Sequence, residues 1–585
     1  MSVPDGRAFL GVAQSLTGRR WVGPSPETGR ASEALHLATG LPHALCGVLA
    51  SRGIAAAEAP AFLAPKLKDL LPDPLMLRDM DAAAARILCA AERGERIAVF
   101  ADYDVDGGAS AALIIRWLRA MGRPATLYVP DRIDEGYGPN PPAMRDLAAQ
   151  HDLIVCVDCG TLSFDAIAAA TGTDVVVLDH HLGGETLPPA LAVVNPNRQD
   201  EDGSLAHLCA ASVVFLLLVE INRRLRAAGK AGPDLMGLLD LVALATVADV
   251  APLVGVNRAL VRQGLTVMRQ RGHPGLVALA DAARLADPPN AYHLGFVLGP
   301  RVNAGGRVGR ADLGARLLVS DDAEEAAGLA ARLESFNADR REIEARVRDA
   351  ALAQAAARAG SGALAWAAGD GWHPGVVGIV AARLKEATGR PAVVIGFDGD
   401  EGKGSGRSVA GIDLGAAVQR LALDGALVKG GGHRMAAGLT LTRSQLEPAM
   451  ERLEALLARQ GAGDRSQADL RVDGVLMPGA ATPDLVAAIE TAGPFGAGAP
   501  APRFAFPDMH ILQVRRVGEN HLRLSFGDGS GSRLDAIAFG AFDTPMGAAL
   551  EAQRGGRVHF AGRIEINSWG GRQSVQLRLE DAALP

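Results

Sequence analysis

Short polar clusters that follow apolar runs constrain the fold of this chain more than any other feature of its sequence. Five of them occur in the first half, at residues 101–107 (ADYDVDG), 157–160 (VDCG), 178–181 (LDHH), 195–197 (NPN) and 248–250 (ADV). The apolar runs at 153–157 and 175–178 are typical of parallel strands covered on both faces, and we interpret residues 241–247 in the same way. Because the carboxyl ends of parallel strands meet at one sheet edge, we expect the polar groups to converge in one crevice.

Length and composition predict several globular domains rather than one. The chain has 585 residues, of which 48% are hydrophobic and 21% charged. Residues 321–359 are rich in Ala, Glu and Arg and contain no Pro, which favours long helices. We therefore expect an α/β protein with five parts: an N-terminal segment (1–75), a doubly wound parallel-sheet domain (76–255), a long helical connector (256–360), a second, smaller α/β domain (361–460) and a C-terminal OB-like β-barrel (461–585).

Hydrophobic periodicity assigns the main elements. In the first α/β domain we expect strands at 96–101, 125–129, 153–157 and 175–178 and a helix at 110–121. In the second we expect strands at 363–367, 392–395 and 437–441 and helices at 376–387 and 414–420. In the barrel we expect strands at 511–517, 521–526, 533–539, 557–566 and 574–579.

Charge and cysteine content limit the classes of protein and the cellular compartments that fit the chain. The net charge of -7 argues against a general nucleic-acid coat protein, which would be basic, but not against a nucleic-acid enzyme that uses metal ions. Five cysteines in so long a chain indicate a reducing compartment, and we interpret Cys156 and Cys159 as small buried residues rather than a redox pair. No signal peptide is evident and the longest apolar run, 208–219, is too short to span a bilayer, so we expect a cytoplasmic protein without a membrane partner.

The first cluster has the spacing of a metal site. Asp104 and Asp106 are two residues apart and point to the same side of an extended segment, where they repel one another unless a cation lies between them. Gly107 allows the backbone to turn closely around such a site. Asp102 has the same parity but lies deeper in the strand, so it is a further candidate and not one of the assigned ligands.

The later clusters complete an oxygen-rich ligand set. Asp158 has two carboxylate oxygens and can bridge two metal ions, and Asp249 adds a further carboxylate. His180 and His181 are adjacent and point apart in most conformations, so we expect one to be a ligand and the other a group near the substrate. This mixture favours Mn²⁺ or Mg²⁺ over zinc. A single Asp at a strand end often caps the next helix, so the prediction depends on the clusters together.

Taken together, these motifs resemble the DHH phosphoesterase superfamily, and within it the bacterial single-strand-specific exonucleases. The resemblance extends over nearly the whole chain from about residue 76, and its motifs are DYDVDG (102–107), VDCG (157–160), DHH (179–181), NPN (195–197), ATVADV (245–250), GPRVNAGGR (299–307), GSGRS (404–408) and GGHRMAAG (431–438). The chain departs from the family pattern at 208–212, which lacks the usual glycines, and at Ala499, where Asn is usual. Neither departure falls on the predicted metal ligands.

The resemblance implies a DNA repair and recombination enzyme that hydrolyses single-stranded DNA from its 5′ end and releases 5′-mononucleotides. It implies two bound ions, Mn²⁺ or Mg²⁺, held by Asp104, Asp106, Asp158, His180 and Asp249. His181, Asp158 and Asp106 are then the catalytic residues, with His181 next to the scissile phosphate. Repair exonucleases of this kind often act with a single-strand-binding protein and a helicase, so both are candidate partners.

A 5′-exonuclease must also recognise the end of a strand. Arg407, Ser405 and Ser408 lie on what we interpret as a Gly-rich loop and offer a guanidinium fork, hydroxyls and backbone N–H groups to a phosphate. Further candidate substrate-binding residues are Arg301, Arg307, His433, Arg132 and, for base stacking, Tyr137. A Gly-rich surface turn with a solvated arginine is the plain alternative for 404–408. Aromatic residues are only 4% of the chain, so we expect backbone contacts rather than extended stacking platforms to dominate binding.

Two other functions fit parts of this pattern. A small-nucleotide phosphodiesterase or pyrophosphatase could use the same metal cluster, but such relatives usually lack a terminal barrel. A DNA-binding scaffold without activity would be expected to have lost metal-binding carboxylates, and all five clusters are intact.

Overall fold

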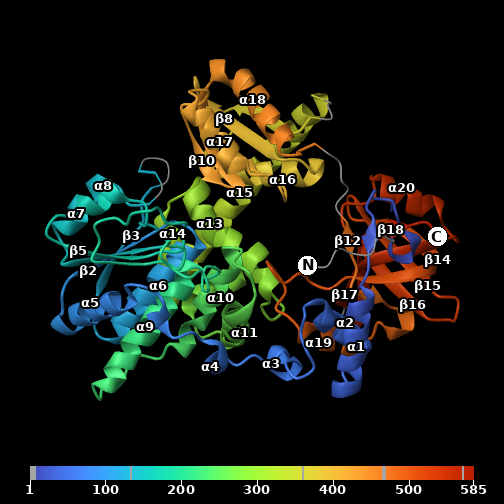
Figure 1. Cartoon of the computed structure of the whole chain (residues 1–585), viewed down its shortest axis with the longest axis horizontal. Coiled ribbons are helices and arrows are strands. Elements are labelled where there is room, and N and C mark those ends of the chain that lie inside the picture. The colour runs from blue at the N-terminus through green and yellow to red at the C-terminus, as the bar shows by residue number, and fades with distance from the viewer. Residues whose placement is uncertain (1–7, 132–134, 137, 359–361, 464–468, 570–571) are drawn as a thin grey trace. The chain divides into compact units, whose positions relative to one another are not determined.

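The computed structural model describes residues 8–131, 135–136, 138–358, 362–463, 469–569 and 572–585 (Figure 1). Two compact units make up the chain. One contains Pro72–Ala251 and Gln263–Arg465, and the other contains Met1–Leu71, Pro252–Arg262 and Ser466–Pro585. The N-terminal segment therefore belongs to the same unit as the C-terminal barrel.

The first α/β domain is built on a parallel sheet, as predicted, and the sheet has five strands, of which the last, at 192–194, was not assigned from the sequence. Its strands, in spatial order, are β3 (Ala125–Tyr128), β2 (Ile97–Ala101), β4 (Leu153–Val157), β5 (Asp174–Leu178) and β6 (Ala192–Val194). Strands β2 and β4 are buried along their whole length, which explains their uninterrupted apolar sequence.

Helices cover both faces of this sheet, so the domain is doubly wound (Figure 1). On one face lie α5 (Met80–Arg93), α6 (Val105–Ala120) and α9 (Ala210–Ala227), and on the other α7 (Pro141–Ala148) and α8 (Phe164–Ala168). Helix α6 begins earlier than the predicted 110–121 because the Asp104 side chain caps its first turn.

The interpretation of residues 241–247 as a strand is wrong. These residues belong to helix α10 (Leu239–Ala248), in which every side chain from Leu239 to Thr246 is buried. A helix that is covered all round has no polar face, so its sequence has the same apolar appearance as a buried strand.

The connector between the two α/β domains is helical, as predicted. It contains α11 (Gly255–Met268), α12 (Pro274–Ala282), the π-helix η4 (His293–Leu298), α13 (Gly299–Val308), α14 (Asp312–Val319) and α15 (Ala323–Ala357). The last of these is a single helix of 35 residues that lies within the predicted range 321–359. The Asp322 side chain caps its N-terminus by accepting hydrogen bonds from the Glu324 and Glu325 N–H groups.

The second α/β domain has a mixed five-stranded sheet with helices α16 (Pro374–Thr388), α17 (Leu414–Leu423) and α18 (Leu446–Arg459). Its strands, in spatial order, are β10 (Lys429–His433), β11 (Ala436–Thr442), β9 (Glu401–Arg407), β8 (Ala392–Asp398) and β7 (Ala365–Asp370). Strands β7, β8 and β11 and both predicted helices are confirmed. Strands β9 and β10 were not predicted, and β9 contains most of the segment that we interpreted as a loop.

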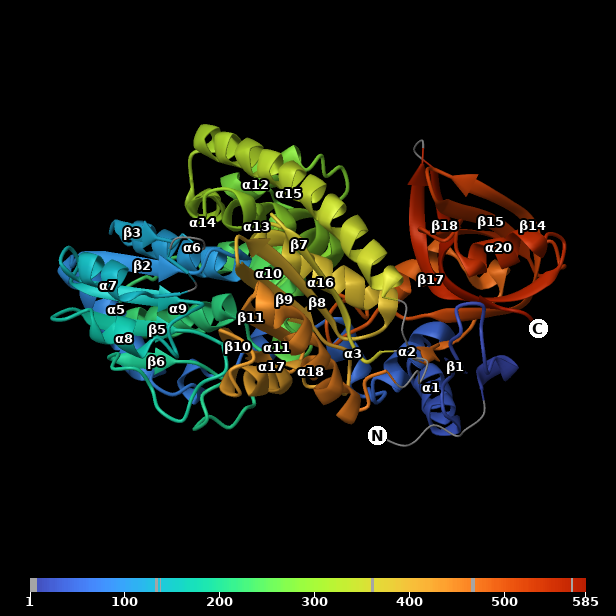
Figure 2. The same ribbon diagram turned by 90° about the horizontal axis from the view of Figure 1, so that it is seen from above.

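The other unit contains the predicted barrel. Its strands are β14 (Phe504–Val517), β15 (His521–Gly527), β16 (Arg533–Ala538), β17 (Arg557–Trp569) and β18 (Arg572–Ala583). Pairing of β14 with β17 closes the sheet, whose strands curve round in Figure 2. Near the N-terminus, β1 (Trp21–Val22) pairs with β12 (Leu470–Arg471), and the buried Trp21 Nε1 donates to Asp581 Oδ2 at 2.9 Å.

Candidate functional site

The register of the parallel sheet brings four of the polar clusters to one edge. Ala101 pairs with Val157, Val157 with Leu178, and Leu178 with Val194. The residue that follows each of these strand ends is polar, namely Asp102, Asp158, Asp179 and Asn195. The predicted convergence at the carboxyl ends of the strands is therefore confirmed.

Backbone N–H groups hold two of the three carboxylates of the first cluster, those of Asp104 and Asp106. Asp104 Oδ1 accepts hydrogen bonds from the N–H groups of Asp106 and Gly107, at 2.9 and 3.1 Å. The buried Asp106 accepts from Ala210 and Ala211, at 2.7 and 2.8 Å, at the first turn of α9. Helix N-termini favour negative charge, so Asp106 is held as an oriented acceptor.

His180 lies among three of the predicted carboxylate ligands. Its Nε2 is 3.2 Å from Asp158 Oδ1 and 3.7 Å from Asp106 Oδ2, and its Nδ1 is 3.8 Å from Asp249 Oδ2. Asp158 has a φ of 60°, a left-handed conformation that Asp tolerates better than most residues. His180 thus joins the sheet edge to the end of α10, where Asp249 is located.

Asp249 reaches the cluster from a helix and not from a strand. It is the C-cap residue of α10, and the next residue, Val250, has a φ of 62°. A β-branched residue in the left-handed region is strained, and such strain is concentrated at functional sites. Asp249 therefore lies beside His180, as the predicted cluster requires, although the element that carries it was predicted wrongly.

The His181 ring lies next to that of His180, with centroids 4.6 Å apart, so the two side chains do not point apart as predicted, and His181 pairs with Asp179. The His181 Nδ1 is 2.8 Å from Asp179 Oδ1, while it is 4.0 Å from Asp158 Oδ1. Burial acts to lower the pKa of His181, but the hydrogen bond to Asp179 and nearby carboxylates raise it to about 9. Burial acts to raise the pKa of Asp179, yet its hydrogen bonds with His181 and Thr161 bring it below the usual value. Sequence reasoning gave Asp179 no role, although it opens the DHH triplet.

Two carboxyl groups of the cluster, those of Asp158 and Asp249, have raised pKa values, which a bound cation would lower. Burial raises the pKa of Asp158 well above the usual value, and repulsion from Asp106 raises it further. Burial and then repulsion from Asp106 also raise the pKa of Asp249 to about 8. Raised pKa values of this kind favour the protonated carboxyl groups, whereas a bound divalent ion stabilises their charged forms.

Three overlapping groups in the described residues have ligand atoms within 4.8 Å of one another. They are Asp158 with His180 and His181, Asp106 with His180 and Asp249, and Asp102 with Asp104 and Asp158. Asp158 and His180 each belong to two of these groups, as expected where two ions share ligands. The donors are mainly carboxylate oxygens with one or two imidazoles, so the residues fit Mn²⁺ or Mg²⁺.

Two of the three predicted phosphate-binding residues at 404–408, Ser405 and Arg407, contact one another, and Ser408 does not join them. On β9, Arg407 Nη1 donates to Ser405 Oγ at 2.9 Å. A Cβ on Gly378 of α16 would lie 3.1 Å from both Arg407 Nη2 and Ser405 Oγ, so this glycine leaves room for the pair. Ser408 is buried and donates to the Ile412 carbonyl at 2.9 Å, which directs its hydroxyl into the core.

A groove of about 500 Å³ beside this pair is lined by basic side chains. Its basic residues are Arg307, His373, Lys403 and Lys429, and glycine backbone from β9, β10 and β11 forms much of the rest. Among the described residues that line it, none is acidic. Sequence reasoning identified Arg307 and Ser405 here but not Lys403, Lys429 or His373, because isolated basic residues carry no motif.

Known proteins combine the same domains. Family models match the DHH family, N-terminal domain (residues 96–246), the DHHA1 domain (360–459) and the RecJ OB domain (472–581). The single-stranded-DNA-specific exonucleases RecJ of Salmonella typhimurium and Escherichia coli are each 37% identical over 94% of this chain and 97% of their own length. The chain belongs to the RecJ family.

Solved structures agree with this assignment. The crystal structure of RecJ in complex with Mn²⁺ from Thermus thermophilus has a TM-score of 0.80 and 30% identity, and the match covers 97% of this chain and 79% of that chain. A RecJ–Mg²⁺ complex from the same organism has a TM-score of 0.75 and 29% identity, over 97% of this chain and 78% of that chain. The domain order of the RecJ family is thus also that of this chain.

The other predicted substrate-binding residues of this RecJ-family chain do not line the basic groove or lie outside the described residues. Arg301 is buried and forms an ion pair with Glu334 of α15, so it stabilises the helical connector. His433 is exposed at the end of β10 and does not line the basic groove. Arg132 and Tyr137 lie outside the described residues.

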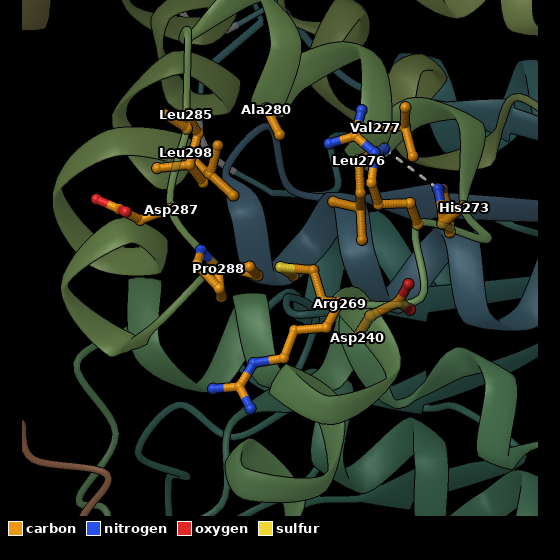
Figure 3. Close-up of a pocket in the computed structure, with 14 residues that line it drawn as sticks. Asp240, Arg269, His273, Leu276, Val277, Ala280, Leu285, Asp287, Pro288 and Leu298 are labelled. Atoms are coloured by element: carbon orange, nitrogen blue, oxygen red, sulfur yellow. Dashed lines mark hydrogen bonds between the residues drawn. The ribbon is translucent and has the colours of Figure 1, made fainter. Parts of the chain in front are cut away.

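A different cavity, of about 310 Å³, is lined by residues of α10, α11, α12 and the segment before η4 (Figure 3). Asp240 and His273 are both buried and lie on one side of it. Burial raises the pKa of Asp240 to about 7 and lowers that of His273 to about 4. None of the predicted metal ligands lines this cavity.

The cysteines behave as small core residues. All five are free, and burial raises the pKa of the Cys156 and Cys159 thiols, which opposes the thiolate form needed for redox chemistry. Within the described ranges, no helix is long and apolar enough to cross a bilayer.

Proposed function

We propose that this chain is a metal-dependent exonuclease of DNA repair and recombination that degrades single-stranded DNA from the 5′ end and releases 5′-mononucleotides. The convergence of Asp106, Asp158, His180 and Asp249 at one edge of the parallel sheet is the observation that carries this proposal. Their donor atoms suit the Mn²⁺ and Mg²⁺ ions named for the Thermus thermophilus relatives.

In the proposed centre, Asp104, Asp106, Asp158, His180 and Asp249 hold two divalent ions, with Asp102 as a further candidate. Two such ions, when bound, lower the pKa of water and neutralise charge on the phosphoryl oxygens. The α9 N-terminus keeps the Asp106 carboxylate in place through its two N–H groups. A carboxylate fixed in this way requires little reorganisation when the substrate binds.

Asp179 acts in this proposal as a positioning residue. It accepts hydrogen bonds from the His181 ring and from the Thr161 N–H, the latter at 3.0 Å, which fixes its own carboxylate and the imidazole together. The Asn195 amide donates to the His181 carbonyl at 2.8 Å and to the Thr161 hydroxyl at 2.9 Å, so the backbone is fixed as well. The His181 side chain remains 40% exposed and is therefore accessible to a phosphate at the sheet edge.

We assign recognition of the strand to the basic groove. Ser405 and Arg407 form the hydrogen-bonded pair at its edge, and Arg307, Lys403 and Lys429 supply positive charge around it. Guanidinium and ammonium groups with accessible backbone N–H groups suit a terminal or backbone phosphate. Ser408 and Arg301 are not part of this assignment because their polar groups are engaged in the interior.

One degradation assay tests the direction and the substrate. Single strands labelled at the 5′ or the 3′ end are incubated with Mn²⁺ or Mg²⁺, beside a duplex of the same sequence and a dinucleotide. We expect immediate release of labelled mononucleotide from the 5′-labelled single strand and a shrinking ladder from the 3′-labelled one. Faster hydrolysis of the dinucleotide would assign the chain to small-nucleotide phosphodiesterases instead.

We further propose that the chain works in the cytoplasm together with a single-strand-binding protein and a helicase. Support comes from its five free cysteines, which are typical of a reducing compartment, and from its need for single-stranded substrate. Degradation of duplex DNA only when a helicase is added would support the helicase part of the proposal.

A further inference from the structure

Two aromatic rings project from the connector of the larger unit without being buried. Tyr292, the residue that precedes η4, and Phe296 within it are 55% and 65% exposed. Their rings are stacked, with centroids 5.1 Å apart and 25° between their planes. Large apolar side chains are normally buried, so the exposure of these two on a rare π-helical turn points to an interaction surface.

The helix that carries these rings is pressed against the candidate metal centre. A Cβ on Gly295 would lie 3.3 Å from Val247 Cγ1, and one on Gly299 would lie 3.2 Å from Ala248 Cβ. Ala248 directly precedes Asp249, so η4 runs along the last turn of the helix that presents this ligand. The same Gly299 position is 3.9 Å from Val105 Cγ2, between Asp104 and Asp106.

The rings lie a few residues along the same helical stretch from Gly299, which packs beside the candidate metal centre. Helix η4 continues directly into α13 at Gly299. Phe296 precedes Gly299 by three residues and Tyr292 precedes it by seven. A strand whose phosphate lies at the metal centre can extend along this stretch with its next few nucleotides.

We propose that Tyr292 and Phe296 form a base-stacking platform for the single strand as it enters the metal centre. This inference rests on the proposed exonuclease function. Every base has a π-face, so an aromatic platform holds a strand without reading its sequence. His293 meets Tyr292 edge-on at 6.0 Å and 70°, which supports the ring from its side and leaves its face for stacking.

The stacked arrangement of the two rings also favours a ligand that itself stacks, such as a base. Aromatic residues are only 4% of the chain, yet two of them occupy neighbouring exposed positions in the same stacked arrangement that bases adopt. Exposed aliphatic residues such as Leu423, 83% exposed on α17, have no such arrangement. The platform also revises the expectation that stacking plays little part in this chain.

The test combines ring removal with base removal. The KM and kcat of nucleotide release are measured for wild type, Tyr292→Ala, Phe296→Ala and Phe296→Trp on a normal single strand and on one with abasic sites near its 5′ end. We expect each alanine variant to raise KM by about 5- to 100-fold with little change in kcat, and Phe296→Trp to stay near wild type. On the abasic strand, wild type and the alanine variants should converge, because the stacking partner is absent.

Two controls separate the possible failures. Leu423→Ala removes another exposed hydrophobic side chain and should leave KM unchanged. If wild type shows no metal-dependent release from single strands, the proposed function fails. If wild type is active but the alanine variants keep its KM, or lose the same factor on both strands, the platform is refuted and the rings belong to a protein-binding surface.

Discussion

The acidic cluster of the DHH domain and the basic groove of the DHHA1 domain position their functional groups by different means. The cluster uses side chains at the ends of buried parallel strands, where register alone aligns Asp102, Asp158 and Asp179. The groove uses glycine-rich antiparallel strands, whose backbone forms the floor, and basic side chains such as Lys403 and Lys429 around it. The acidic cluster concentrates negative charge, which bound cations would neutralise. The basic groove concentrates positive charge, which a phosphate group would neutralise.

This difference separates two tasks that a nuclease must perform. Changes in the acidic cluster should abolish the chemical step, since metal ions supply most of it. Changes in the basic groove should weaken binding in a way that depends on salt, since phosphate contacts release counterions. Variants in the two regions should therefore differ in kind as well as in size.

The largest effect is expected for Asp158→Ala. This change removes the carboxylate that belongs to two of the three ligand groups, so nucleotide release in Mn²⁺ should fall by about 10³-fold or more. The matched control is Asp165→Asn, an exposed acid on α8, which should keep wild-type activity. Retained activity in Asp158→Ala, with an unchanged circular dichroism spectrum, would contradict the metal assignment.

A smaller loss is expected for Asp179→Asn. The amide keeps the size of the side chain but weakens the hydrogen bond that orients His181, and changes of this kind typically lower activity or metal affinity by about 10- to 100-fold. Measured kcat should fall while the number of bound Mn²⁺ ions stays at the wild-type value. A loss of bound ions would instead make Asp179 part of the ligand set.

Single changes in the basic groove should act on binding. Lys403→Ala and Arg407→Ala should each weaken single-strand binding and reduce the slope of log affinity against log salt by about 0.7, as expected for one lost phosphate contact. Arg407→Ala should also reduce the preference for a 5′-phosphorylated end. Fluorescence anisotropy over a salt series measures affinity and slope, and the same measurement on strands with and without a 5′-phosphate measures the preference. Arg459→Ala, an exposed arginine on α18, is the control and should keep the wild-type slope.

Asp240→Asn tests a buried carboxyl group that lies outside the acidic cluster and is not a predicted metal ligand. Its folded pKa of about 7 exceeds the usual value of 3.8, so the folded state holds a proton that the unfolded state has lost. Stability should therefore decline as pH rises from about 4 to 7, by up to about 4 kcal/mol from this group.

The Asn variant removes that titration while activity stays at the wild-type level. Thermal unfolding measured from pH 5 to 8 should show the variant gaining stability relative to wild type as pH rises. A constant difference between the two proteins would show that Asp240 is ionised in the folded state.

The convergence of the acidic residues at the strand ends could be predicted from the sequence because each strand end has a local sequence pattern. Each apolar run that ends in a polar cluster at 101, 157, 178 and 194 is a parallel strand, and parallel strands bring their ends together by their own geometry. The run before Asp249 was misread because a helix buried on all sides has the same composition as a buried strand.

The basic groove was harder to predict because its determinants are distant in sequence. Strand β9 contains Gly404 and Gly406, which disfavour a strand by propensity. Side chains of Leu439 and Leu414 pack where their Cβ atoms would be, at 2.9 and 2.7 Å, so the close packing requires glycine there. Lys403 and Lys429 come together only through the pairing of β9, β11 and β10, which no local pattern reveals.

The most direct test of the account is the number of Mn²⁺ ions that bind to the chain, measured by titration calorimetry on wild type and on Asp158→Asn. The shared ligand groups predict two ions for wild type, and fewer than two, or a much weaker pair, when the Asp158 carboxylate is replaced by an amide. Equal stoichiometry and affinity in the two proteins would contradict the claim that the carboxyl ends of these strands form a two-metal centre.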